Sequence, residues 1–101
     1  MLLISGSIGL TVKYDVQPTE RTSFQNLQKK LEELATSKPG CKIFKLHEDF
    51  KDPSCFWLIE EWESVAAWKP YLLSAERATS IESMMAMVNG IPKVALYSVC
   101  Y

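Results

Sequence analysis

Segments with strand-like and helix-like spacing of apolar residues follow one another along the 101 residues in the order strand, helix, strand, strand, helix, strand. Residues 4–16 alternate apolar and polar positions, and this period of two predicts a strand. Residues 20–37 carry an amphipathic helix stripe formed by Phe24, Leu27, Leu31 and Leu34. We expect Thr19 or Thr22 to cap this helix, and Gln28 to lie outside its apolar stripe.

The second half of the chain begins with a predicted hairpin. Residues 41–48 and 55–62 both read as strands, and the turn 48–54 between them is short and polar. Ser64 is expected to cap a following helix, which Pro70 should kink or break because proline removes a backbone donor. A second helical run over residues 75–88 carries on one face Ala78, Ile81, Met85 and Val88. Asn89-Gly90 stops this run, and residues 93–100 form the last predicted strand.

This order of elements predicts a ferredoxin-like βαββαβ fold of the α+β class, with a four-stranded antiparallel sheet. Its helices lie on one face of the sheet and cannot cover the other. The first and third strands are apolar on both faces. We therefore expect a homodimer in which a second copy packs sheet to sheet.

Composition excludes several classes of protein. The 11 basic and 12 acidic residues are interleaved and give a net charge of -1, so no basic face for nucleic acid is expected. A hydrophobic fraction of 48% is too high for a disordered chain. Three widely spaced cysteines do not form the even set of a secreted disulfide scaffold, and free thiols are predicted.

The chain carries no pattern typical of targeting to a membrane. The apolar residues 1–4 follow no basic residue and are interrupted by serine and glycine, unlike a signal peptide. No apolar run reaches the length of about 20 residues that a membrane span requires. We expect a cytoplasmic protein.

Several short segments, in order between about residues 10 and 98, resemble the antibiotic biosynthesis monooxygenase (ABM) family of the dimeric α/β-barrel superfamily. They are Phe24-Gln25-Asn26-Leu27, the Pro-Gly-Cys turn in residues 37–41, Asp52-Pro53, the strand ending in Glu-x-Trp within residues 56–64, and Gly90-Ile91-Pro92-Lys93-Val94. The resemblance implies one ABM-like domain over residues 1–101 and a dimeric α/β barrel. It also implies a cofactor-independent monooxygenase that holds a small aromatic or quinone-like metabolite in a pocket.

The sequence departs from the family at positions linked to activity. Many members carry a histidine nine residues after the strand-ending Trp, where this chain has Tyr71. Heme-degrading relatives also use an asparagine on the first strand and a later histidine, where this chain has Gly6, Ser7 or Gly9 and Ile81. Heme is therefore not expected. No Gly-x-Gly-x-x-Gly loop and no metal-ligand spacing is present, so neither flavin nor metal is expected.

Trp62, Trp68 and Tyr71 are the candidate pocket residues. Trp62 ends a predicted strand, and Trp68 and Tyr71 are neighbours on the following helix. The two indoles would bind a flat substrate, and the Tyr71 hydroxyl would donate to a substrate oxygen. The alternative is that all three are plain core, which is the commoner role of an aromatic stripe.

Glu60 and His47 are the candidate acid–base residues. Glu60 alternates with Leu58 and Trp62, so it shares an apolar face where its pKa would be raised and it could serve as a base. Alternatively, it pairs with a cation across the dimer. His47 could shuttle protons, or it is a surface histidine in a charged loop.

Two functions remain open at this point. The first is a cofactor-independent oxygenase or isomerase acting on a small aromatic or quinone-like metabolite. The second is a non-catalytic dimeric module that binds a small hydrophobic ligand or acts in a stress response. The fold hosts both, so the pocket has to distinguish them.

Overall fold

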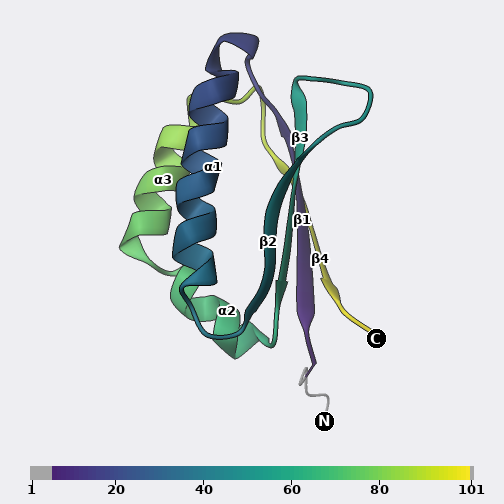
Figure 1. Ribbon diagram of the computed structural model, residues 1–101, viewed down its shortest axis with the longest axis vertical. Coiled ribbons are helices and arrows are strands. Elements are labelled where there is room, and N and C mark those ends of the chain that lie inside the picture. The colour runs from purple at the N-terminus through teal and green to yellow at the C-terminus, as the bar shows by residue number, and fades with distance from the viewer. Residues whose placement is uncertain (1–5, 101) are drawn as a thin grey trace.

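The computed structural model describes residues 6–100, and eight elements lie in this range (Figure 1). They are β1 (Ile8–Asp15), the short 3-10 helix η1 (Pro18–Glu20), α1 (Arg21–Thr36), β2 (Cys41–Glu48), β3 (Cys55–Trp62), α2 (Val65–Leu72), α3 (Ala75–Met85) and β4 (Lys93–Ser98). Residues 4 and 5 of the first predicted strand lie outside the described residues, as do residues 1–4, for which a signal peptide was not expected.

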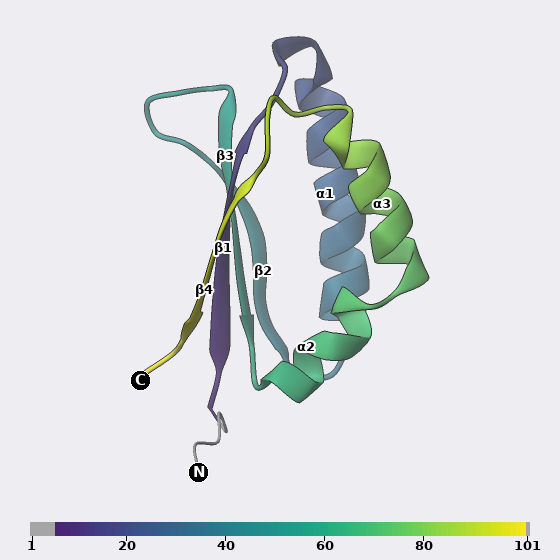
Figure 2. The same cartoon turned by 180° about the vertical axis from the view of Figure 1, so that it is seen from behind.

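The four strands form one antiparallel sheet in the order β2-β3-β1-β4. The helices lie on one side of this sheet, with α1 and α3 side by side and α2 crossing one end, as both views show (Figures 1 and 2). The ferredoxin-like arrangement predicted from the sequence is therefore confirmed, with the second helical segment divided into α2 and α3.

The buried face of α1 differs from the predicted stripe by part of a turn. Phe24 and Leu31 are buried as expected, but Leu27 and Leu34 are only partly buried. Gln28, which was expected outside the stripe, is buried and donates from Nε2 to the Met84 sulfur at 3.5 Å. The predicted stripe was therefore right in Phe24 and Leu31, with Leu27 and Leu34 packed against the edge of the core, and wrong in excluding Gln28.

The start of α1 also differs from the prediction. Neither Thr19 nor Thr22 caps the helix, because η1 leads directly into it and places Glu20 at the N-cap without a side-chain hydrogen bond. A preceding 3-10 turn of this kind is a common way to begin an α-helix.

The helical segment after β3 breaks shortly after Pro70, as predicted. Ser64 caps α2 by accepting a hydrogen bond from the Ala67 amide at 3.1 Å, also as predicted. The helix contains Pro70 and ends at Leu72, and Ser74 then caps α3 by accepting from the Arg77 amide at 3.2 Å. The chain thus changes direction between two capped helices.

The inward face of α3 was predicted correctly in part. Ile81 packs against the core and Val88 is buried, as expected, whereas Ala78 and Met85 of the predicted face are exposed and Met84 is buried instead. The helix also ends at Met85, so Val88 follows it. Arg77, four residues before Ile81, lines the cavity on the same side of the helix.

Strand β4 forms an edge of the sheet that the helices leave partly uncovered. Val94 and Leu96 pair with Val12 and Leu10 and so lie on the helix-facing side. They remain 63% and 58% exposed, while Val12 and Leu10 are buried.

The three cysteines are free, as predicted.

The turn between α1 and β2 provides a test of the fold. Gly40 has φ +89°, and a Cβ there would lie 2.6 Å from the Ala67 Cβ. Gly40→Ala should therefore cost about 2–4 kcal/mol, since it combines a left-handed backbone with overpacking. Gly90 has φ +71° with no atom near its absent Cβ, so Gly90→Ala should cost only about 1–2 kcal/mol. Urea unfolding of both variants measures this, and equal losses would contradict the packing at Gly40.

Candidate functional site

A cavity of about 210 Å³ lies between the helices and the sheet, on the side of β4. Its apolar wall includes Leu10, Val12, Leu58, Val94 and Leu96. Four polar side chains from four different elements line the same cavity: Tyr14, Glu60, Tyr71 and Arg77. Convergent polar groups in an apolar cavity are typical of a small-molecule site.

The pleat of β3 places the carboxylate of Glu60 in this cavity. Glu60 lies opposite Leu10 of β1 and on the same face as Leu58 and Trp62. It is 4% exposed, and its Oε1 accepts a hydrogen bond from the Trp62 indole Nε1 at 3.0 Å. Burial raises the pKa of Glu60 above its ordinary value, and the Trp62 hydrogen bond and the charge of Arg77 only partly oppose this.

Tyr71 is held in the last turn of α2 by three neighbours. Its ring stacks on Trp62 at 5.5 Å between centroids and meets the edge of Phe44 at 5.7 Å. The guanidinium carbon of Arg77 lies 5.5 Å from its centroid. Burial, followed by the nearby charge of Glu60, raises the pKa of Tyr71, so its hydroxyl keeps its proton at neutral pH.

Arg77 and Tyr14 are cavity residues that the sequence analysis missed. Arg77 comes from the first turn of α3, one residue before the Ala78 that was assigned to the apolar face. Its Nη1 reaches the Leu72 carbonyl at 3.5 Å, and its Nε is buried without a hydrogen-bond partner. Tyr14 was read only as an apolar member of the strand pattern. Burial raises its pKa to about 12.

The structure brings together three of the five residues proposed from sequence. Glu60, Trp68 and Tyr71 line the cavity, whereas Trp62 is fully buried behind Tyr71 and does not line it. Trp62 therefore supports the site through its stack on Tyr71 and its hydrogen bond to Glu60.

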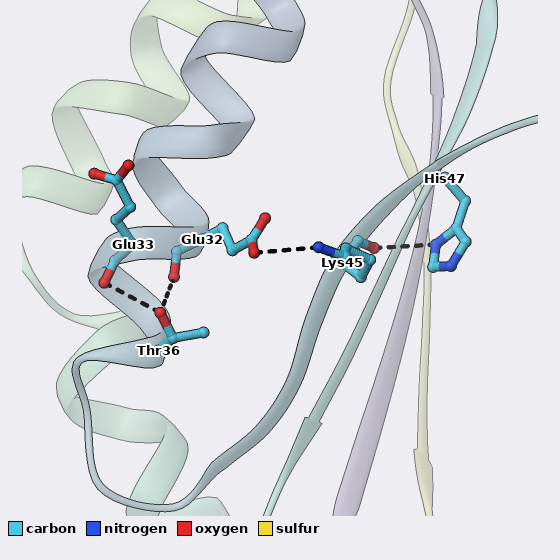
Figure 3. A network of polar contacts seen from close by, with 5 residues as sticks. All are labelled: Glu32, Glu33, Thr36, Lys45 and His47. Atoms are coloured by element: carbon cyan, nitrogen blue, oxygen red, sulfur yellow. Dashed lines mark hydrogen bonds and ion pairs between the residues drawn. The ribbon is translucent and has the colours of Figure 1, made fainter.

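His47 lies elsewhere, exposed on β2 (Figure 3). Its Nδ1 is 3.2 Å from the Lys45 carbonyl oxygen, and the Lys45 Nζ pairs with Glu32 of α1 at 3.4 Å (Figure 3). It does not line the cavity that contains Glu60 and Tyr71.

A larger hollow of about 470 Å³ is lined by Lys13, Asp15, Asp52 and Lys93 among others. Its charges of both signs belong to exposed side chains, which is typical of a solvated surface depression. The smaller cavity is the better candidate because Tyr14, Glu60 and Tyr71 in its wall are buried and burial raises their pKa values. Within residues 6–100, no cluster of three or more His, Cys, Asp or Glu side chains is arranged to hold a metal ion.

The family model for the antibiotic biosynthesis monooxygenases matches residues 7–82. The chain belongs to the ABM family. The matched region contains Tyr14, Glu60, Tyr71 and Arg77, whereas Val94 and Leu96 follow it. No curated protein matches the chain.

Solved structures with the same fold include a candidate antibiotic biosynthesis monooxygenase from Caulobacter crescentus CB15, with a TM-score of 0.91 and 19% identity over 97% of this chain and 93% of that one. A second from Nitrosomonas europaea has a TM-score of 0.89 and 17% identity over 100% and 97% of the two chains. A conserved protein from Methanosarcina mazei Go1 has a TM-score of 0.88 and 19% identity over 93% of each chain. At these identities the likeness establishes the ABM fold.

None of the helices described in residues 6–100 is both long enough and apolar enough to span a membrane.

The buried carboxyl of this ABM domain makes its stability depend on pH. Below about pH 4.5 Glu60 is protonated in both the unfolded and folded states, and above it the unfolded chain ionises first because the folded pKa is raised. The wild type should thus lose stability relative to Glu60→Gln as pH rises from about 4 to 7. The loss should be about 1.4 kcal/mol for every tenfold difference between the acid dissociation constants of the folded and unfolded states. Urea unfolding of both proteins at the two pH values measures the difference. A difference that stays constant would contradict the raised pKa.

Proposed function

We propose that this ABM-family chain is a cofactor-independent monooxygenase that acts on a small aromatic or quinone-like metabolite. The observation that carries the proposal is the buried Glu60 carboxylate, which faces an apolar cavity and forms no ion pair with another residue of the described chain. A carboxylate in such surroundings is a stronger base than one in water.

The size of the cavity supports a ligand built on one aromatic ring. A cavity of roughly 150 Å³ lined by apolar side chains holds benzene. The volume of about 210 Å³ here leaves room for a ring and small substituents. Trp68 in the wall offers an aromatic surface against which the ring would pack.

The proposed chemistry begins with a proton transfer. Glu60 takes the proton of the substrate hydroxyl, and Tyr71 donates a hydrogen bond to a substrate oxygen. The resulting electron-rich phenolate supplies the electrons that reduce oxygen. One oxygen atom enters the ring to give a quinone carbonyl, and the other leaves as water. The protein contributes the base, the hydrogen bond and a site from which bulk water is excluded.

Removal of these groups should affect turnover more than folding. Glu60→Gln should lower kcat by about 10²–10⁴-fold, since it removes the general base. Tyr71→Phe should lower kcat/KM by about tenfold, the value of one lost hydrogen bond. Oxygen uptake with a panel of simple phenols and hydroquinones measures both, with thermal unfolding as the check on folding.

Tyr97→Phe is the matched control, because Tyr97 lies on β4 with its hydroxyl bonded to Thr11 at 3.1 Å and does not line the cavity. Saturable binding of these compounds without any oxygen uptake would overturn the oxygenase in favour of a ligand-binding module.

We also propose that the chain is a homodimer that packs through the face of the sheet opposite the helices. Trp57 and Ile59 of β3 lie on that face and are only partly buried, and no helix of the described chain covers it (Figure 1). Apolar groups on an uncovered sheet face favour association.

Charge placed on this face should separate the two copies. Ile59→Asp should convert a dimer into a monomer, since it buries an unpaired carboxylate at the interface. Leu73→Asp is the control, because Leu73 is an exposed leucine in the helical layer. Sedimentation at micromolar concentration compares them, and a monomeric wild type would refute the proposal.

A further inference from the structure

The guanidinium of Arg77 is the one strongly cationic group in the wall of the cavity, and its hydrogen bonding is incomplete. The ion pairs within residues 6–100 involve Arg21, Lys42 and Lys45 but not Arg77. Its Nε is buried without a partner, and the hydrogen bond from its Nη1 to the Leu72 carbonyl is long at 3.5 Å. Buried donors are rarely left unpaired, so an additional acceptor is expected here.

Three titratable groups besides Arg77 line the cavity. Tyr14 comes from β1, Glu60 from β3 and Tyr71 from α2, whereas β4 contributes only the apolar Val94 and Leu96. The β4 side of the cavity is therefore apolar, and the polar groups come from the other elements. A complementary ligand carries its polar atom at one end of a hydrophobic ring.

We propose that Arg77 is the phenolate-binding residue of this site and that the ligand is a single-ring phenol whose oxygen lies between Arg77, Glu60 and Tyr71. This inference rests on the proposed function and adds to it the residue that binds the phenolate oxygen. Guanidinium N–H groups form strong, charge-assisted hydrogen bonds with anionic oxygens. The buried Nε supplies such a donor without a competing partner.

The charges in the cavity remain balanced through the proton transfer. Before transfer, the Glu60 carboxylate is the negative charge that faces Arg77. After transfer, the O–H bond of the phenol is broken, Glu60 carries the proton, and the phenolate oxygen is the negative charge. Arg77 opposes one negative charge in both states. Without Arg77, the phenolate would be an uncompensated anion in an apolar cavity, which is costly.

Binding of 4-nitrophenol tests this without any turnover. The compound has one ring and ionises to a yellow anion, so absorbance of the bound fraction at different pH values gives its pKa in the complex. Binding to the wild type should lower the pKa of 4-nitrophenol by about one unit or more. A lowering of one unit means that the protein binds the anion about tenfold more tightly than the neutral phenol. Arg77→Gln should abolish this lowering, whereas Lys69→Gln should retain it, because Lys69 is an exposed cation on α2.

A second measurement uses only the wild type and so does not depend on the folding of a variant. 4-Nitroanisole has the same ring but cannot ionise. Its affinity should not rise with pH, whereas that of 4-nitrophenol should rise as the phenol ionises. Absence of saturable 4-nitrophenol binding, equal pH behaviour of the two probes, or an equally lowered pKa of the bound phenol in Arg77→Gln would each overturn the role of Arg77. Failure of oxygen uptake with an intact, Arg77-dependent lowering of that pKa would instead refute only the oxygenase.

Discussion

Burial of the Glu60 carboxylate in the centre of the sheet is the constraint to which the surrounding residues are adapted. The pleat of β3 gives this position the same inward direction as Phe56, Leu58 and Trp62, so the carboxylate lies on the buried face of the sheet. The Trp62 indole donates a hydrogen bond to one carboxylate oxygen of Glu60, and the positive charge of Arg77 favours the ionised carboxylate. Neither partner restores its ordinary pKa. A residue that weakens folding at neutral pH in this way is typical of a site kept for chemistry.

The break between α2 and α3 is what brings Tyr71 and Arg77 to the same cavity. The two residues are six apart, and in one continuous helix their side chains would point in directions about 120° apart. The helix instead ends at Leu72 and begins again after Ser74. The new phase turns Arg77 toward the ring of Tyr71, where its guanidinium carbon lies 5.5 Å from the centroid. Pro70 and the Ser74 cap are therefore part of the construction of the site.

The strands were more predictable from the sequence than the inward faces of the helices. The first strand followed from the alternation of apolar and polar residues, where an error of one residue would expose a whole face. Glu60 was recognised by the same alternation. The inward faces of the helices were harder to predict, because a helical stripe can rotate by one residue and remain amphipathic. Gln28 was expected outside the stripe and is buried, whereas Met85 was expected inside it and is exposed. Arg77 was missed because an apolar stripe does not assign a charged residue to the inward face, although Arg77, Ile81 and Met84 have helical spacing.

The cavity itself results from an offset between the two layers of the fold. α1 packs against β2 at one edge of the sheet, whereas Val94 and Leu96 of β4 at the other edge stay more than half exposed. Full coverage of β4 by the helices would fill the space with side chains and leave Glu60 sealed from any substrate. The uncovered edge therefore provides both an apolar wall and a route to solvent. A ring bound there would cover β4 as an additional helix would, so part of its binding energy would come from apolar surface that folding leaves exposed.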